Sequence, residues 1–162
     1  MERATRRATI GYGEQVKCLS IRNPWAWAIV TGKKDVENRA WSRLPYYRGP
    51  LLIHASKRPD EAGAFRACAE ILGVPASHLC NRDDMKYGGV VGVCYFAHVV
   101  KESPSPWFFG PLGLVLQDAI PLPFTPLLGQ LGLFDVDVDH DLCEDAQKEL
   151  AKWGGLAHGV EK

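Results

Sequence analysis

The sequence predicts an α+β fold in which five or six strands form a small mixed or barrel-like sheet flanked by helices. Short apolar segments, several with alternating polarity, recur along the chain, and two or three longer segments have helical periodicity. The 11 prolines and 16 glycines indicate many turns between short elements. The chain has 162 residues, 46% of them hydrophobic, so a single domain can bury a sizeable core.

The first predicted elements are a strand and a buried helix. Residues 16–21 alternate in polarity and predict a strand. Asn23 suits a helix cap, Pro24 the first helical position and Gly32 the left-handed residue that ends a helix. Because nothing between Pro24 and Gly32 is charged, we expect the helix to be mostly buried. Lys34 then follows closely on a rigid element.

The remaining elements are predicted from periodicity and turn signals. We expect Pro121 to end its strand, because proline has no N–H group for the ladder. Residues 78–89 predict a polar connection. Further strands are predicted at residues 35–41, 50–56, 90–100, 112–122 and 131–138, and helices at residues 58–73 and 141–153.

Three parts are expected along the chain. Residues 1–15 are rich in arginine and lack apolar periodicity, so we expect a flexible tail. Residues 16–138 hold the predicted strands and form the domain, and residues 139–162 contain an acidic helix packed on or beside it. The apolar side of that helix is formed by Leu142, Ala146, Leu150 and Trp153.

Composition excludes several classes of protein. No apolar run approaches the roughly 20 residues that a membrane span needs, and the N-terminus has no apolar stretch like the core of a signal peptide. The five cysteines are odd in number and none are spaced C-x-x-C, which favours reduced thiols and no metal site. We therefore expect a soluble, cytoplasmic protein without cofactors.

Charge is unevenly spread along the chain, although the formal net charge is +0. Residues 32–58 carry seven basic groups against two acidic ones, whereas residues 135–149 carry seven acidic groups against one lysine. A neutral total can therefore hide a basic face, and such a face suits a phosphate backbone. The alternative is a dipolar surface that binds nothing.

One strand has an unusual distribution of charge. In a pleated strand alternate residues share a face, which puts Asp35, Glu37, Arg39 and Trp41 on the same side of residues 35–41. Such a side belongs either to an edge strand that faces water or to the polar wall of a pocket.

Few other residues indicate chemistry. The chain has no phosphate-binding loop of the Walker type and no G-x-S-x-G elbow, and His54 and His98 lie in apolar strands where a satisfied core histidine is expected. The best polar constellation is Lys34, Glu37 and Arg39. A lysine beside buried aromatic residues can act as a base or nucleophile, and an arginine can bind phosphate or polarise a carbonyl. The alternative is a purely structural ion-pair network.

A family resemblance gives this constellation a context. The stretch SIRNPWAWAIVTGKKDVENRAW resembles the signature of the ASCH domain within the PUA-like superfamily, whose core pattern G-x-K-x-x-E-x-R is met by Gly32, Lys34, Glu37 and Arg39. The stretches YRGPLLIHAS, SPWFFGPLGLVL and GQLGLFDV resemble the compact bacterial members. The resemblance covers about residues 17–138.

The resemblance implies a PUA-like fold, which is a small β-barrel flanked by helices, with a cleft near the first helix. Related folds bind RNA or modified bases, some small ASCH proteins remove the acyl group from acetylated cytidine, and some bacterial members cut RNA. The catalytic lysine of those amidohydrolases matches Lys34, whereas their pattern has threonine where this chain has Glu37. The charged face of residues 35–41 is then a ligand-facing wall with Lys34 at its mouth.

Three functions follow as hypotheses. The first is an RNA-binding module that recognises a nucleotide or a modified base in the Lys/Glu/Arg cleft. The second is a hydrolase in the same cleft, either a metal-independent ribonuclease or an amidohydrolase on acylated cytidine. In that case Glu37 or Tyr47 is the base, and Lys34 or Arg39 steadies the phosphate. The third is a protein-interaction module that uses the acidic C-terminal helix.

Further residues suit nucleic-acid binding. Aromatic side chains stack on bases for roughly 1–3 kcal/mol each, and basic side chains hold phosphates through salt-dependent contacts. The stacking candidates are Trp25, Trp41, Tyr47, Trp107 and Phe108, most of which we expect to be core. The phosphate-binding candidates are Arg43, Arg48, Lys57 and Arg58.

Overall fold

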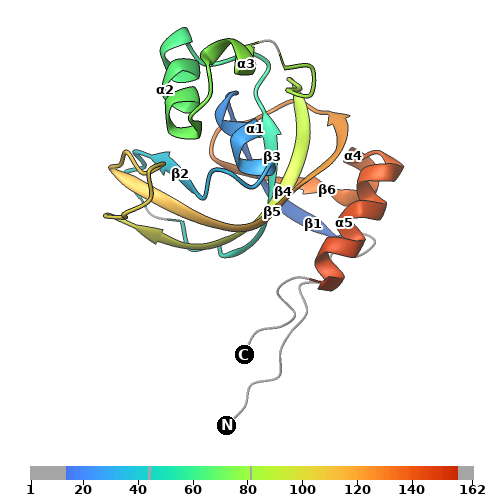
Figure 1. Cartoon of the computed structure of the whole chain (residues 1–162). Helices are drawn as coiled ribbons and strands as arrows, with labels where there is room; N and C mark the ends of the chain where they lie inside the picture. The colour runs from blue at the N-terminus through green and yellow to red at the C-terminus, as the bar shows by residue number, and fades with distance from the viewer. Residues whose placement is uncertain (1–13, 44, 81, 157–162) are drawn as a thin grey trace.

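The computed structural model describes residues 14–43, 45–80 and 82–156. Residues 1–13 of the predicted tail lie outside the described residues, whereas Gln15, the last residue of that tail, belongs to the first strand. The elements, in chain order, are β1 (Gln15–Ile21), α1 (Trp25–Val30), β2 (Val36–Arg39), β3 (Gly49–Ala55), α2 (Ala62–Leu72), α3 (Ala76–Cys80), β4 (Gly89–Val100), β5 (Leu112–Pro126), β6 (Leu133–Asp137), α4 (Val138–Asp141) and α5 (Glu144–Leu156) (Figure 1).

Six strands form one mixed sheet in the order β2-β5-β4-β3-β1-β6. Strands β1 and β3 run parallel, and the other neighbouring pairs are antiparallel. Helices α1, α2 and α3 gather in one part of the molecule in Figure 1, and α4 and α5 in another. The predicted α+β fold, with six strands flanked by helices, is confirmed.

The sheet is not closed into a complete barrel. Strands β2 and β6 are its two edges, and no backbone ladder joins β2 to β1 or β6 within the described residues. Strand β2 has only 4 residues and pairs with β5. A side chain crosses the gap instead, because Nη2 of Arg39 on β2 donates to the carbonyl oxygen of Ser20 on β1 at 3.0 Å. We call this opening between β2 and β1 the seam.

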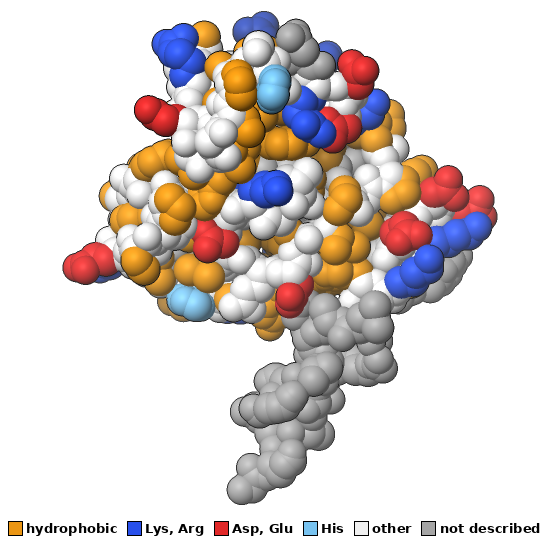
Figure 2. Space-filling view, viewed as in Figure 1, with side chains coloured by type: hydrophobic (Ala, Val, Ile, Leu, Met, Phe, Trp, Pro, Cys, Tyr) orange, Lys and Arg blue, Asp and Glu red, His pale blue; other side chains and the backbone are white. Residues whose placement is uncertain are grey.

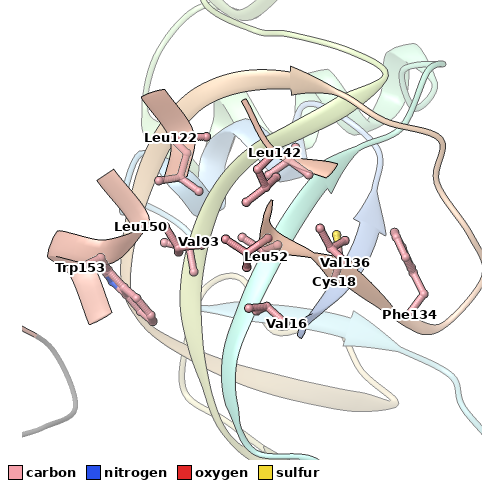
Figure 3. Packing of buried hydrophobic residues seen from close by; sticks show 13 residues of the cluster. Val16, Cys18, Leu52, Val93, Leu122, Phe134, Val136, Leu142, Leu150 and Trp153 are labelled. Carbon is pink, nitrogen blue, oxygen red and sulfur yellow. The ribbon is translucent and has the colours of Figure 1, made fainter. Parts of the chain in front are cut away.

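The core lies on both faces of the sheet. Alternation along β1 places Cys18 in one apolar cluster and Leu19 in the other. The first cluster is sealed by α5, whose Leu150 and Trp153 pack toward strand residues such as Leu52 (Figure 3). The predicted apolar side of this helix is therefore confirmed. The second cluster is covered by α1, and partly buried aromatic side chains border it.

Strand β5 is longer than predicted. It continues past Pro121 to Pro126, so the prediction that Pro121 ends the strand is wrong. The register of β4 against β5 shifts between Val90, which faces Thr125, and Gly92, which faces Pro121. Pro121 itself is paired with Gly92 at the boundary of this shift, and within the described residues β2 pairs with β5 only from Leu112 to Val115, so Pro121 lies where β5 has an unpaired edge that needs no N–H group.

The predicted C-terminal ends of the helices agree with the structure better than their predicted N-terminal ends do. Helix α1 is followed by Gly32 and α2 by Gly73, both with the positive φ that ends a helix. Helix α1 begins after Pro24, and the side chain of Asn23 accepts the backbone N–H of Trp27 at 2.9 Å. Helices α3 and α4 were not predicted, because 5 and 4 residues are too few to show periodicity.

Other features of the described residues bear on the kind of protein. No described helix combines the length and apolar character that crossing a membrane requires. The cysteines are free thiols, and Cys18, Cys68 and Cys94 are buried. Within the residues described, no three His, Cys, Asp or Glu side chains are grouped as a metal site would need.

Candidate functional site

The candidate site lies at the seam and is built from α1, β2 and the turn between them. The backbone N–H of Lys34 donates to the carbonyl oxygen of Ala28 in α1 at 2.9 Å. Lys34 is therefore attached to the end of a buried helix. Strand β2 then presents Glu37 and Arg39 two residues apart, on one face of the pleat.

Lys34, Glu37 and Arg39 form one ion-pair network. The Nζ of Lys34 lies 3.0 Å from Oε1 of Glu37, and Nη2 of Arg39 lies 3.2 Å from Oε2 of the same carboxylate. Lys34 also donates to the carbonyl oxygen of Val36, and Arg39 to that of Ser20. The Glu37 carboxylate is thus held between two cations, each of which is fixed by a backbone carbonyl.

The three charged side chains are buried to different depths. The side chain of Lys34 is 1% exposed, that of Glu37 10% and that of Arg39 23%. The ring centroid of Trp25 lies 5.7 Å from Nζ of Lys34, and that of Trp41 lies 5.6 Å from Cζ of Arg39. From the sequence, Lys34 is predicted at the mouth of the cleft, but Lys34 is the most deeply buried of the three side chains. Arg39 is nearest the mouth, because Lys34 is buried against the aromatic residue that starts α1.

The network has one more positive charge than negative. The Nε of Arg39 is buried and has no hydrogen-bond partner within the described residues. A buried donor without a partner is unfavourable, and a guanidinium group offers five N–H donors in a planar fork. A ligand cannot reach the buried Nε, but the Arg39 side chain is 23% exposed, so the site suits a ligand that brings an anionic or carbonyl oxygen to the exposed part of the guanidinium.

The charged side of residues 35–41 was expected either to face water on an edge strand or to form a polar wall, and the structure shows some of each. Strand β2 is an edge strand, yet Glu37 is buried and Arg39 and Trp41 are partly buried. Asp35 is exposed and accepts a hydrogen bond from the hydroxyl of Ser105 at 2.6 Å. Three of the four residues thus gather at the seam, and the fourth anchors the loop between β4 and β5.

The predicted aromatic residues surround the network at different depths. Trp25 is partly exposed, and its Nε1 donates to Asp60 at 2.9 Å. Its ring lies edge-on to Trp107 and to Phe109, each at 6.3 Å between centroids. Trp107 is buried, and Phe108 is partly buried against the same cluster. Trp25 and Trp41 are therefore the predicted tryptophans with surface left for a ligand.

Tyr47 packs against the same apolar cluster as Trp25 and Trp41. Its hydroxyl donates to the carbonyl oxygen of Pro50. Burial raises the pKa of Tyr47 to about 12, and the charge of Asp135 adds to the shift. A phenol in this state is protonated at neutral pH and already donates its proton, which does not favour Tyr47 as a general base.

The predicted phosphate-binding residues lie at two separate ends of β3. Arg43 and Arg48 precede this strand, and Lys57 and Arg58 follow it. Strand β3 has 7 residues, so its ends are about 20 Å apart at about 3.3 Å per residue. The guanidinium of Arg48 donates to two backbone carbonyls and lies over the ring of Phe96, 4.8 Å from its centroid. The four cations therefore do not form one phosphate site.

Asn38, whose side chain joins β2 to the loop between β4 and β5, was not predicted as a site residue from the sequence. Its Nδ2 donates to the carbonyl oxygen of Trp107 at 2.9 Å, and its Oδ1 accepts the N–H groups of Phe109 and Gly110 at 2.7 and 3.0 Å. The available signal was an amide alone on the apolar side of a charged strand. Such a group can serve a loop as donor and acceptor at once.

Of the two histidines expected in the core, His54 is a satisfied core residue, as predicted, whereas His98 is exposed. His54 is buried, its Nδ1 lies 3.0 Å from the hydroxyl of Ser20, and its Nε2 lies 2.6 Å from the carbonyl oxygen of Leu127. A carbonyl can only accept, so Nε2 carries the proton and Nδ1 accepts from Ser20. This histidine therefore fastens the segment after β5 to the sheet.

The chain was compared with known proteins in sequence and in structure. A family model described as the ASCH domain matches residues 19–107, a range that includes Lys34, Glu37 and Arg39. No curated protein is detectably similar to the chain.

Solved structures with a similar fold include ASCH from Zymomonas mobilis, with 16% sequence identity and a TM-score of 0.48 over 84% of this chain and 93% of that one. A tyrosine-to-phenylalanine variant of the same protein has 17% identity and a TM-score of 0.45, covering 84% of this chain and 96% of that one. A serine-to-alanine variant has 17% identity and a TM-score of 0.45, covering 84% and 94%.

Proposed function

Because the chain belongs to the ASCH domain family, we propose that it is an RNA-binding protein that recognises a nucleotide or a modified base at the seam. The observation that carries the proposal is the buried network of Lys34, Glu37 and Arg39. It places the Arg39 guanidinium, whose side chain is 23% exposed, at the seam beside Trp41, while Trp25 lies beside Lys34.

Arg39 and Trp41 are the proposed contacts to the base. A guanidinium recognises carbonyl oxygens or ring nitrogens on the edge of a base, while an aromatic ring stacks on its face. Because Arg39 is held by Glu37 and Ser20, little rotational freedom remains to be lost when a ligand binds. Such a fixed donor favours discrimination between bases over affinity alone.

Lys34 and Glu37 are proposed as positioning residues. The Lys34 ammonium is covered by Trp25 and occupied by Glu37 and by the carbonyl oxygen of Val36. Its role is to fix the carboxylate that in turn orients Arg39. This assignment separates it from the catalytic lysine that the family resemblance implies.

The two other hypotheses have less support from the geometry. Hydrolysis at the seam needs a base, yet both oxygens of Glu37 are engaged by cations and the hydroxyl of Tyr47 donates to Pro50. A protein-interaction module needs a free apolar helix face, yet the apolar side of α5 is buried against the sheet through Leu150 and Trp153.

The test is a titration of fluorescein-labelled single-stranded RNA followed by anisotropy, with the samples also run on a denaturing gel. We expect the wild type to bind and leave the RNA intact, Arg39→Ala to bind at least tenfold more weakly and Arg39→Lys to be intermediate. Lys148→Ala is the matched control, because Lys148 is exposed on α5 and is not one of the proposed binding residues, and it should bind within twofold of wild type.

A panel of modified oligonucleotides, including one with acetylated cytidine, then identifies the preferred base. RNA cleaved by the wild type but not by Arg39→Ala would replace a recognition site with a ribonuclease. Release of acetate from acetylated cytidine would make the protein an amidohydrolase. Absence of binding and turnover in every assay would refute the proposal.

A further inference from the structure

We propose that the end of the sheet where β1 and β3 terminate binds the sugar-phosphate backbone of single-stranded RNA as the strand leaves the seam. This inference rests on the proposed function and adds to it the direction in which the bound RNA strand leaves the seam. The surface consists of Arg22, Lys57, Arg58, Lys86 and Tyr87, and we call it the strand-end surface.

Hydrogen bonds bring three separate loops together at the strand-end surface. Strands β1 and β3 are parallel, so the residues that follow them emerge at the same end of the sheet. The backbone N–H of Ser56 donates to the carbonyl oxygen of Ile21 at 2.9 Å. The side chain of Asn23 donates to the carbonyl oxygen of Lys86 at 2.7 Å. Residues 22, 57, 58 and 86 are therefore neighbours in space.

The cations of this surface are available to a ligand. Arg22, Lys57, Arg58 and Lys86 are exposed, and none of them forms an ion pair with another residue in the part of the chain described. Four cations spread over three loops suit a chain of phosphates better than one small anion, because a single phosphate cannot reach them all.

The acidic residues nearby are partly engaged elsewhere. The carboxylate of Asp60 accepts the indole N–H of Trp25 at 2.9 Å and the backbone N–H of Glu61 at 2.8 Å. Asp84 is bound by two N–H groups of Arg82, at 2.7 and 2.8 Å. Figure 2 shows basic and acidic side chains interspersed on the face that it displays, without one large basic patch.

An exposed aromatic ring distinguishes this surface from a simple anion site. Tyr87 is 37% exposed and follows Lys86 directly. Next to it, Cγ of Lys57 lies 3.9 Å from where a β-carbon on Gly88 would stand. Aromatic rings interleaved with cations are the usual means of binding single strands, because every base has a face that can stack.

The strand-end surface is continuous with the seam. Arg39 binds the carbonyl oxygen of Ser20, two residues before Arg22. Trp25, which covers Lys34, binds Asp60, two residues after Arg58. A strand with one base at the seam therefore reaches these cations within a few nucleotides.

The opposite end of β3 fits a phosphate backbone less well. Arg48 is occupied there by backbone carbonyls. Strand β6 runs beside β1 in the antiparallel sense, which places Asp135 and Asp137 next to Lys17 and Gln15 at the beginning of β1. Although Lys17 pairs with Asp135 at 2.9 Å, the acidic strand disfavours a second polyanion at this end.

The test compares two double variants in the full chain. Lys57→Ala with Lys86→Ala removes two cations of the strand-end surface, and Lys101→Ala with Lys148→Ala removes two exposed cations that are not part of it. Binding of a labelled 12-nucleotide and a labelled 3-nucleotide single-stranded RNA is measured by anisotropy over a range of salt, with thermal unfolding as the check that each variant folds.

We expect the strand-end variant to bind the 12-nucleotide RNA about tenfold more weakly at low salt. Its slope of log affinity against log salt should fall by about 1.4, at about 0.7 for each lost single-strand contact. Binding of the 3-nucleotide RNA and binding by the control variant should stay within twofold of wild type. Tyr87→Ala should weaken the longer RNA several-fold, and Tyr87→Phe should restore it.

Four results would overturn the inference. If both double variants weaken binding equally, the cations act only through overall charge. If the control variant alone loses affinity, the strand leaves over another surface of the protein. If the wild type binds neither RNA, the proposed function fails as well. If the wild type binds RNA and the strand-end variant binds it equally well, only the inference fails.

Discussion

The seam and the α5 face of the sheet are sealed by opposite means. Under α5 the chain buries Leu52, Leu150 and Trp153 in an apolar cluster, whereas at the seam it buries Lys34 against Glu37. Apolar burial stabilises a fold by about 25 cal/mol for each Å² removed from water. A buried ion pair often contributes little, because desolvation offsets the Coulomb attraction. The contrast assigns stability to the α5 face and points to ligand recognition at the seam.

The largest expected effect on stability comes from removing only one partner of the Lys34–Glu37 ion pair. Glu37→Ala leaves the ammonium of Lys34 buried without its carboxylate, so we expect the free energy of unfolding to fall by about 3–5 kcal/mol. The double replacement Lys34→Met with Glu37→Leu removes the buried pair and leaves only Arg39, whose side chain is 23% exposed, without its carboxylate, so it should cost clearly less stability than Glu37→Ala. Urea unfolding measures both.

The double replacement is the sharper half of this test, because it should remove RNA binding while keeping the fold. Should it destabilise the protein as much as Glu37→Ala does, the network would be structural after all. The contrast between the two regions would then disappear.

The next effect is expected on the α5 face. Leu150 is fully buried, so Leu150→Ala should lower the free energy of unfolding by about 2–5 kcal/mol through lost burial and a cavity. RNA affinity, measured well below the midpoint of unfolding, should not change. Leu128→Ala is the matched control, because this leucine is 85% exposed and its truncation should change stability by less than about 0.5 kcal/mol. A loss of RNA affinity in Leu150→Ala would show that the two regions are coupled.

The smallest effect is expected at Tyr47, which borders the seam. Tyr47→Phe removes a hydrogen bond to the carbonyl oxygen of Pro50 and should lower the free energy of unfolding by about 1 kcal/mol, with RNA binding unchanged. The pKa of Tyr47 is raised from 10.0 to about 12 in the fold, so the folded protein holds this proton more tightly than the unfolded chain.

The stability contributed by that shift is present below pH 10 and is lost as the pH rises toward 12. Tyr47→Phe should therefore weaken the fall in stability over this range, which urea unfolding at a series of alkaline pH values can measure. Loss of RNA binding or of any turnover in Tyr47→Phe would instead give the phenol a role in chemistry.

Much of the fold was predictable because local signals and tertiary packing agree. The alternation in residues 16–21 is met by β1, and the glycines after α1 and α2 have the positive φ that their positions predicted. Predictions failed where a tertiary feature overrode a local rule. Pro121 lies inside β5 at the boundary of a register shift and on an edge that β2 does not pair with there, and nothing in the sequence near Pro121 reports either feature.

The sequence by itself determined the composition of the site, because Gly32, Lys34, Glu37 and Arg39 have the spacing that a helix end followed by a strand requires. The tertiary structure alone decided which charge is innermost and where the strand edges open. Those depend on Trp25 covering Lys34 and on Arg39 reaching Ser20 across the seam. Arg39 and Ser20 lie on strands that are not neighbours in the sheet, and Trp25 covers Lys34 only when α1 and the turn after it have folded, so no residue spacing encodes either contact.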